Sequence, residues 1–554
     1  MIWLLTALAV VAALVYHFWS SNNNTKDFYN LPGPSFKWYS PVLGNLVDLE
    51  TCRDTLVSPD WVKLGWTGRY RFLFGTERMY TLDPGAIGHI LGRPDEWVKP
   101  TDFKTIMRRV TGEGLVTVEG AQHKRQRRVL SPAFSTSALA SMGPVLWTKA
   151  AELVQLFQAL IADDTLEDLA ARPPKPEDRV PGARKIDVIR HMNSFSADVI
   201  GLCGFGHDFD SLSRKGPSDP LAEDFANLVD ACAEDALMTE AQNQFPLLDL
   251  IPTKPRRIVD RCKKSVDQIS AKFVARKRAE IHDLGGGMEL SEEEAGKDIL
   301  SRLMAANARE SGKAAMSDDE VRDQIATMLF AGSSTAAVSL SAVLYRLAEN
   351  PRVQSKLRAE LQELADAPDM SVLDAAPYLD HVVRESLRLD SPVTCTVREA
   401  AKDTVLPLEV PVKGRDGRMM SEVAVKKGTY VLLSFSGMHT APELWGEDAM
   451  EFKPERFEEE GWPRMPIPGI VKNRAVCAPA RVRVCPSAEP AQDRADYDVH
   501  PQARGQGRDG IADAPACQEC YGVRFSGFPW MEREEEGATL GVALSSGLLE
   551  CLAT

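Results

Sequence analysis

The chain has 554 residues, a formal net charge of -14 and ten cysteines. This length permits one large domain or two to three smaller ones. The acidic balance argues against a nucleic-acid partner, since proteins bind nucleic acids by neutralising phosphate charge. Through the first 395 residues the cysteines lack the paired spacing of a disulfide framework, which indicates a reducing compartment.

The N-terminal residues 2–19 form an apolar run without a formally charged side chain. About 18 residues is the lower limit for a helix that spans a bilayer. Trp3, Tyr16 and Trp19 lie near the ends of this run, where aromatic rings favour the membrane interface. A cleaved signal peptide is the alternative, but the basic segment that should precede its apolar core is absent. We therefore expect a transmembrane helix over residues 1–20.

Residues 21–36 are polar and proline-rich. Proline stops helix propagation and stiffens an extended chain, so we interpret this stretch as a hinge. It leads into a domain that we place at residues 37–470.

This domain is predicted to be mainly α with a minor β-sheet region. Residues 69–82 alternate in polarity and contain β-branched and aromatic residues, which predicts a hairpin around Gly75. Asp83 and Pro84 should begin the next helix, as N-cap and first helical residue. Residues 422–436 are typical of two short strands around a Lys-Gly pair.

Helical periodicity dominates from residue 120 to about 365. It is interrupted by polar linkers at 171–183 and 213–220 and by three glycines at 285–287. Ser317 and Glu320 form a capping box that begins a long helix. Asn350 and Pro351 should end that helix and begin the next.

Three patterns in this domain carry chemistry. The first is the basic segment at 120–128 (GAQHKRQRR), which begins a predicted helix. His123 and Arg127 share one helix face and can bind the same carboxylate groups, whereas Lys124 and Arg128 face elsewhere. The alternative is a solvated charged face without a ligand.

The second pattern is AGSSTA, residues 331–336, inside the long helix. Gly332 costs about 1 kcal/mol of helix stability relative to Ala, a cost tolerated where another group must approach the backbone. The Thr335 hydroxyl can donate to the carbonyl of Ala331 and loosen the helix locally. The alternative is that these small residues only allow close helix packing.

The third pattern is the pair Glu385 and Arg388, followed downstream by PERF with Arg456. An ExxR pair alone fits any helix face as an ion pair. The ordered set of the basic segment, AGxxT, ExxR and PERF is more specific. From about residue 30 to 465 the chain resembles the cytochrome P-450 family of haem-thiolate monooxygenases, and its N-terminus resembles the membrane-bound eukaryotic, fungal-like members.

The resemblance implies the triangular prism fold of that family and a haem b (heme) group whose iron binds a cysteine thiolate. It also implies a reductase partner that transfers electrons from NADPH, dioxygen as co-substrate and an apolar small-molecule substrate. The protein is then expected in the endoplasmic reticulum membrane, with a single N-terminal anchor and a cytosolic catalytic domain. The segments that would line the pocket, 101–118, 225–250 and 391–397, do not reveal the substrate.

The resemblance also assigns roles to residues. His123, Arg127 and Arg398 would bind the haem propionates, and Ala331 and Gly332 would make room for dioxygen. Thr335 would direct protons to the oxygen. Ser334 occupies a position where the family usually has an acidic residue, and a serine can relay a proton but cannot supply one from a carboxylate. Glu385, Arg388 and Arg456 would form a structural triad that fixes the segment before the cysteine loop.

The cysteine loop of the family, FxxGxRxCxG, is not intact in this chain. Cys485 keeps the RxC fragment with Arg483 and is the candidate metal ligand. However, Arg481 and Ser487 occupy the two glycine positions, and Ala478 occupies the phenylalanine position. The apolar helix that should follow the loop is replaced by polar sequence.

A shift of reading frame offers an explanation for this tail. If residues 491–503 are read one nucleotide later, permitted codons give Leu-Lys-Ile-Ala-Leu-Ile-Met-Thr-Phe-Thr-Arg-Lys-Leu, an amphipathic helix much like the missing one. We therefore interpret residues 471–554 as an anomalous tail, frame-shifted or mis-spliced. A genuine but different tail is the alternative.

Three functions follow from these observations. The first is a membrane-anchored monooxygenase. The second is a family member that rearranges or dehydrates its substrate without a reductase, which Ser334 favours. The third is a haem-less, non-catalytic membrane protein, because the cysteine ligand loop is broken.

Overall fold

The computed structural model of the chain describes residues 25–35, 44–51, 59–162, 186–213, 242, 251–283, 298–310, 312–364 and 368–458. The expected anchor, the linker at 171–183, the three glycines at 285–287 and the tail with Cys485 lie outside these ranges, as does most of the linker at 213–220.

The described part of the chain is mainly helical. In chain order its α-helices are α2 (Lys26–Asn30), α4 (Leu46–Thr51), α5 (Pro59–Val62), α6 (Pro84–Leu91), α7 (Thr101–Thr111), α8 (Gly120–Leu130), α9 (Thr136–Ala140), α10 (Gly143–Ala162), α11 (Val188–Phe205), α14 (Lys254–Asp283), α15 (Ile299–Ala308), α16 (Asp318–Glu349), α17 (Pro351–Gln362), α18 (Met370–Leu373), α19 (Pro377–Leu389), α20 (Phe435–His439) and α21 (Pro442–Trp445). The 3-10 helices are η1 (Leu73–Gly75), η2 (Ser131–Phe134), η5 (Gly312–Ala314) and η6 (Pro454–Phe457).

The strands form two small sheets, as predicted for a minor β region. They are β1 (Thr67–Arg71), β2 (Glu77–Thr81), β3 (Trp97–Val98), β4 (Cys395–Ala400), β5 (Thr404–Lys413), β6 (Met419–Val425) and β7 (Tyr430–Ser434). The larger sheet has the order β1-β2-β7-β4-β3, and β5 pairs with β6 alone. Within the larger sheet β2 and β7 are parallel and the other neighbours are antiparallel.

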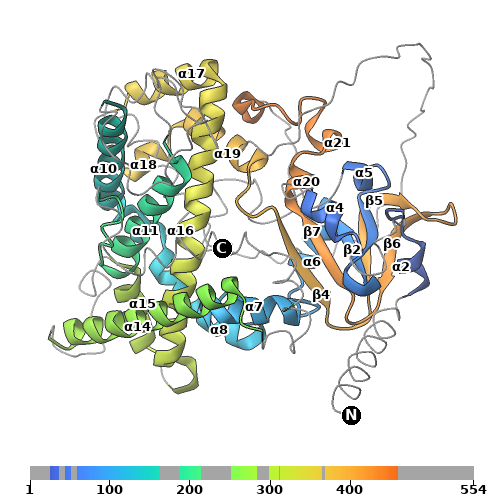
Figure 1. Cartoon of the computed structure of the whole chain (residues 1–554), viewed down its shortest axis with the longest axis horizontal. Helices are drawn as coiled ribbons and strands as arrows, with labels where there is room; N and C mark the ends of the chain where they lie inside the picture. Colours follow the sequence, from blue (N-terminus) through green and yellow to red (C-terminus); the bar gives the residue numbers. More distant parts are fainter. Residues whose placement is uncertain are drawn as a thin grey trace, which may run out of the picture.

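Helix α16 is the longest described helix, at 32 residues, and runs through the helical part of the molecule, with the sheets to one side (Figure 1). Helix α16 packs against α11, and both contribute buried residues to the main hydrophobic core, among them Leu329 and Leu340 of α16 and Phe195 and Val199 of α11. Each fully buried side chain of this size contributes about 1.5–3 kcal/mol of transfer free energy. The core therefore holds α16 rigidly along most of its length.

Local sequence signals predict several elements correctly. The hairpin at 69–82 forms from β1 and β2, and Gly75 adopts the left-handed conformation with φ 72°. The Asp83 carboxylate accepts a hydrogen bond from the N–H of Ala86 over 2.8 Å and caps α6, with Pro84 as first helical residue. The two strands expected in 422–436 are β6 and β7, although they pair with other strands rather than with each other.

The limits of α16 also follow the sequence. The Ser317 hydroxyl accepts from the N–H of Glu320, and the Glu320 carboxylate accepts from the N–H of Ser317, which completes the predicted capping box. The helix ends at Glu349, and Pro351 begins α17.

Strand β5 has no clear signal in the sequence because it contains Pro407 and Pro411, and proline normally excludes a residue from the hydrogen-bonded interior of a sheet. The strand tolerates both because it pairs on one edge only, with an irregularity in register between Pro407 and Val412. Residues 404–413 therefore form a strand because they pair with β6.

Helix α2 lies in the segment expected as a hinge, yet it packs on the domain. Phe28 and Leu31 are fully buried in the cluster that contains the sheet residues. The Thr25 hydroxyl donates to the carbonyl of Ala424 in β6. The carbonyl of Pro32 accepts from the N–H of Arg69 in β1 over 2.9 Å. The described residues from Thr25 to Pro32 are therefore docked on the domain.

Candidate functional site

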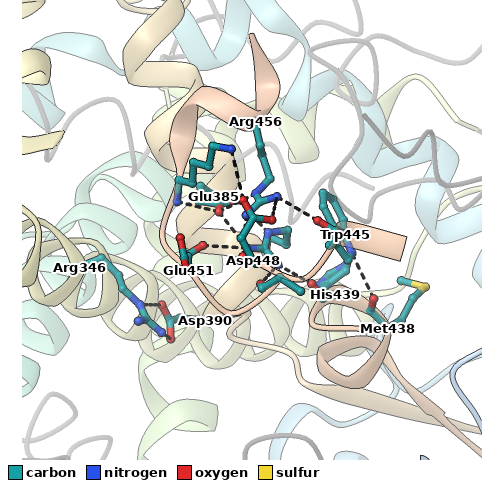
Figure 2. A network of polar contacts seen from close by, with 12 residues as sticks. Arg346, Glu385, Asp390, Met438, His439, Trp445, Asp448, Glu451 and Arg456 are labelled. Carbon is teal, nitrogen blue, oxygen red and sulfur yellow. Dashed lines mark hydrogen bonds and ion pairs between the residues drawn. The ribbon is translucent and has the colours of Figure 1, made fainter. Parts of the chain in front are cut away.

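Helix α19 and the segment before η6 are joined by a buried cluster of charges. Arg388 Nε and Nη2 donate to the two carboxylate oxygens of Glu385 over 2.8 and 2.9 Å. Arg456 Nε, from η6, donates to Glu385 Oε1 over 3.0 Å. Glu385 and Arg388 are fully buried and Arg456 nearly so. The structure thus brings together all three residues of the predicted triad, and Figure 2 shows Glu385 and Arg456 of this cluster.

The remaining donors of the two arginines bind backbone carbonyls between α20 and η6. Arg388 Nη1 donates to the carbonyls of His439 and Ala449 over 2.6 and 2.7 Å. Arg456 Nη2 donates to the carbonyl of Asp448 over 2.9 Å. Burying these charges costs desolvation free energy, so the contacts are not explained by a gain in stability. They indicate that Arg388 and Arg456 fix the path of the loop between α20 and η6.

Two further side chains enclose the triad. The ring of Trp445 lies 4.8 Å from the guanidinium carbon of Arg388, and its indole N–H donates to the carbonyl of Met438 (Figure 2). Burial, followed by the charge of Arg388, lowers the pKa of His439 to about 3. His439 is therefore neutral at physiological pH and adds no third positive charge to the cluster.

Thr335 makes the predicted contact in the middle of α16. Its Oγ1 donates to the carbonyl of Ala331 over 2.6 Å, one turn earlier. Ser333 donates in the same way to the carbonyl of Leu329. Ser334 is half-buried, and its hydroxyl makes no hydrogen bond to any residue that the structure describes. Of these three hydroxyls, that of Ser334 is thus the one not engaged with the helix backbone.

The predicted carboxylate-binding residues lie in one group of basic residues. His123 and Arg127 are four residues apart on α8 and therefore lie on one helix face. Burial, then the charges of Lys99 and Arg127, lower the pKa of His123. Burial also lowers the pKa of Arg398, a half-buried residue of β4. His123, Arg127 and Arg398, the residues predicted to bind carboxylates, thus lie near one another or near Lys99.

Lys99 is the member of the group that the sequence did not reveal. Its Nζ donates to the carbonyls of Val116 and Val118 over 2.6 and 3.2 Å, and its own N–H donates to Glu119 Oε1 over 2.5 Å. Burial, followed by the charge of Arg398, lowers the pKa of Lys99 to about 8. No local motif marks this residue. It follows β3, and only the pairing of β3 with β4 brings it near Arg398.

Lys124 and Arg128 of α8 face solvent, as predicted. Both are largely exposed and form ion pairs with Asp95 at 3.6 Å and Glu310 at 3.2 Å. Exposed pairs of this kind are worth about 1 kcal/mol or less. Both cations therefore remain accessible to an acidic partner.

The comparisons with known proteins agree with these observations. A family model described as cytochrome P-450 matches residues 34–466. The chain belongs to the cytochrome P-450 family. It is 32% identical to cytochrome P-450 monooxygenase 205 of Postia placenta over 477 residues, 84% of each chain. It is 32% identical to cytochrome P-450 monooxygenase claP of Ampulloclitocybe clavipes over 416 residues, 73% of each chain. It is 30% identical to a ganoderic acid synthetase of Ganoderma lucidum over 494 residues, 85% of each chain.

Membership of the cytochrome P-450 family makes this chain a haem-dependent monooxygenase by family and fold. The group of basic residues that contains Lys99, His123, Arg127 and Arg398 has the donors needed to bind the two carboxylates of a haem. Lys99, His123 and Arg398 come from three elements, and Glu119 is the carboxylate whose charge acts on all of them. An anionic group at this position would offset the remaining positive charge. The cysteine side of the site lies outside the described residues.

Two described helices of this cytochrome P-450 are long and apolar enough to cross a membrane by length and composition, α10 and α16. Both contribute buried residues to the main hydrophobic core, so this is weak evidence for a membrane span. The expected anchor at residues 1–20 is not among the described residues.

Proposed function

We propose that the protein is a membrane-anchored monooxygenase that inserts one oxygen atom of dioxygen into an apolar small molecule. Electrons would come from NADPH through a partner reductase, and the protein would reside in the endoplasmic reticulum membrane. The observation that supports this proposal is the grouping of Lys99, His123 and Arg398, which supplies two cations and an imidazole able to bind the carboxylates of a haem. The names of the relatives support the reaction class.

Each part of the site would have a separate task. A bound haem with a thiolate ligand would supply the activation of dioxygen. Lys99, His123, Arg127 and Arg398 would hold its carboxylates. The Thr335 hydroxyl donates to the carbonyl of Ala331, and its oxygen lone pairs remain able to accept a hydrogen bond from a proton-delivering group. Ser334 would relay protons from water, receiving one proton for each that it passes on, because its hydroxyl is not bound to the helix backbone.

Replacing Thr335 by Ala tests this relay. In a version of the protein with an intact cysteine loop, Thr335→Ala should leave the haem content unchanged. It should divert most of the NADPH consumption to peroxide, because proton delivery weakens, and general acid–base contributions are typically about 10²–10⁴-fold. The measurements are the ratio of product to NADPH consumed and the peroxide yield.

Ser333→Ala is the matched control, since Ser333 makes the same type of bond to the backbone of α16. It should keep the coupling of the parent protein. Unchanged coupling in Thr335→Ala would mean that Ser334 or water carries the relay without Thr335.

A reductase-independent member that rearranges or dehydrates its substrate is the second candidate. Ser334 favours it, because the residue before Thr335 lacks the carboxylate that the family usually has there. Product formation without NADPH and reductase from an oxygenated substrate would identify this activity. Strict dependence on both would exclude it.

We further propose that residues 1–20 are a membrane anchor, residues 37–470 the catalytic domain and residues 471–554 a frame-shifted or mis-spliced tail. Of the hinge expected at 21–36, we propose only the part before α2, because α2 packs on the domain. The docking of α2 sharpens the test of the anchor. Deletion of residues 1–24 removes the apolar run but keeps Thr25, which caps α2. We expect this deletion to move much of the protein from the membrane pellet to the soluble fraction without lowering its thermal stability.

Deletion of residues 1–28 is the informative contrast, because it also removes the fully buried Phe28. Loss of a buried aromatic side chain costs about 3–5 kcal/mol, so this longer deletion should unfold at a lower temperature. A full-length protein that fractionates as soluble would contradict the anchor.

A further inference from the structure

We propose that the ion pair between Arg346 and Asp390 is a positioning pair of the site. It fixes the turn at residues 391–394 relative to α16 and thereby helps to determine substrate selectivity. This inference rests on the proposed monooxygenase function and concerns residues outside the family motifs. The two residues are 44 positions apart, and no sequence pattern links them.

The geometry of the pair is that of a fork on a carboxylate. Arg346 Nε donates to Asp390 Oδ2 over 2.7 Å, and Arg346 Nη2 donates to Asp390 Oδ1 over 2.9 Å. The side chains are only 21% and 28% exposed. Two parallel bonds define orientation as well as distance. A partly buried pair is also less screened than a surface pair.

Arg346 connects the ion pair to α16, the helix that carries Thr335. It lies 11 residues after Thr335, three turns along the same helix face, at a rise of about 16 Å. The main core holds α16 on its other sides. The guanidinium group is thus attached to the same rigid element as Thr335.

Asp390 is the residue at which α19 ends and the turn begins. Its N–H donates to the carbonyl of Ser386 over 2.8 Å, so its backbone is still tied to the helix. Figure 2 shows Arg346 and Asp390 beside the cluster that contains Glu385. The pair therefore links α16 to the helix of the triad.

The far end of the turn is held by two backbone hydrogen bonds. The carbonyl of Thr394 accepts from the N–H groups of Phe435 and Ser436 over 2.9 and 3.0 Å. Between the two fixed points, the Ser391 hydroxyl donates to the carbonyl of Val393, whose side chain is 47% exposed. Residues 391–394 are thus a short bridge that presents an apolar side chain, and β4 with Arg398 follows directly.

This arrangement explains why the pair would affect selectivity. With one end bound to Phe435 and Ser436, the position of Val393 relative to Thr335 depends on the other end, at Asp390. Loss of the pair would let the turn shift while both helices stay folded. The pair thus acts through Val393 and does not need to touch the substrate.

Hydrogen–deuterium exchange of the full chain tests the positioning role without any need for haem. In Asp390→Asn and Arg346→Gln, we expect the amides of Asp390, Phe435 and Ser436 to exchange about five- to tenfold faster, as for loss of a partly buried pair. Amides in the core of α11 should keep their rates. Arg346→Lys, which retains the charge but not the fork, should give an intermediate effect.

Arg352→Gln is the matched control. Arg352 also forms a fork on a carboxylate, that of Glu455, but its side chain is 69% exposed. It should leave the three amides unchanged. If exchange in Asp390→Asn is uniformly faster in every core element, the pair only stabilises the fold as a whole. If exchange is unchanged at all three amides, the pair does not position the turn. Either result overturns the proposal.

Selectivity is measured in a version with an intact cysteine loop. Asp390→Asn should change the ratio of products from one apolar substrate by several-fold, with a smaller change in total turnover. An unaltered product ratio, despite faster exchange of the turn, would overturn the link to selectivity. Absence of any monooxygenase product in the parent protein would instead refute the proposed function and leave the exchange result valid.

Discussion

The chain with this sequence should bind haem weakly and give no carbon monoxide spectrum of the thiolate type. The cations of Lys99 and Arg398 and the imidazole of His123 are grouped together, so the carboxylate side of a haem would have partners. The deficient part is the metal ligand, because Cys485 has non-glycine residues at both glycine positions of its loop. Without those glycines the backbone cannot readily turn its amides toward the sulfur, and a thiolate without such donors is harder to keep deprotonated.

Repair of the reading frame provides the comparison. The repaired protein should give a normal thiolate spectrum. In the unrepaired chain, any haem that binds should be lost on Arg398→Gln but be indifferent to Cys485→Ala. A thiolate spectrum from the unrepaired chain that disappears in Cys485→Ala would refute the frame-error interpretation and identify Cys485 as the ligand. It would also exclude the haem-less, non-catalytic alternative.

Glu385→Gln should lower the free energy of unfolding by about 3–5 kcal/mol, because it leaves two buried guanidinium groups without their shared counter-charge. Arg388 and Arg456 both donate to this carboxylate, and the N–H of Lys453 donates to it over 3.0 Å. Urea unfolding of the full chain, followed by tryptophan fluorescence, measures the loss. If Glu385→Gln does not fold, Arg456→Lys keeps the charge without the fork and should give a smaller, measurable loss.

Glu455→Gln is the matched control, one residue before Arg456 in the same motif. Its carboxylate pairs with Arg352 and Lys356, whose side chains are 69% and 43% exposed. Solvent screens such pairs, so the expected loss is about 1 kcal/mol or less. Equal losses in the two variants would show that burial of the triad contributes nothing special to stability.

The sequence by itself determined the features that depend on neighbouring residues. The capping box of α16, the cap of α6 and the left-handed Gly75 arise within one turn of chain. The same holds for the bond from Thr335 to Ala331 and for the pairing of Glu385 with Arg388. Such contacts are predictable because the backbone period of a helix or turn fixes which side chains meet.

The tertiary structure alone decided the features that join distant segments. Arg388 finds the carbonyls of His439 and Ala449, Lys99 comes near Arg398 through the pairing of β3 with β4, and Arg346 meets Asp390 across 44 residues. Strand β5 forms despite two prolines because β6 pairs with it. These contacts depend on how the packed elements are oriented. That orientation is set by the packing of many side chains throughout the core, so no local sequence pattern predicts it.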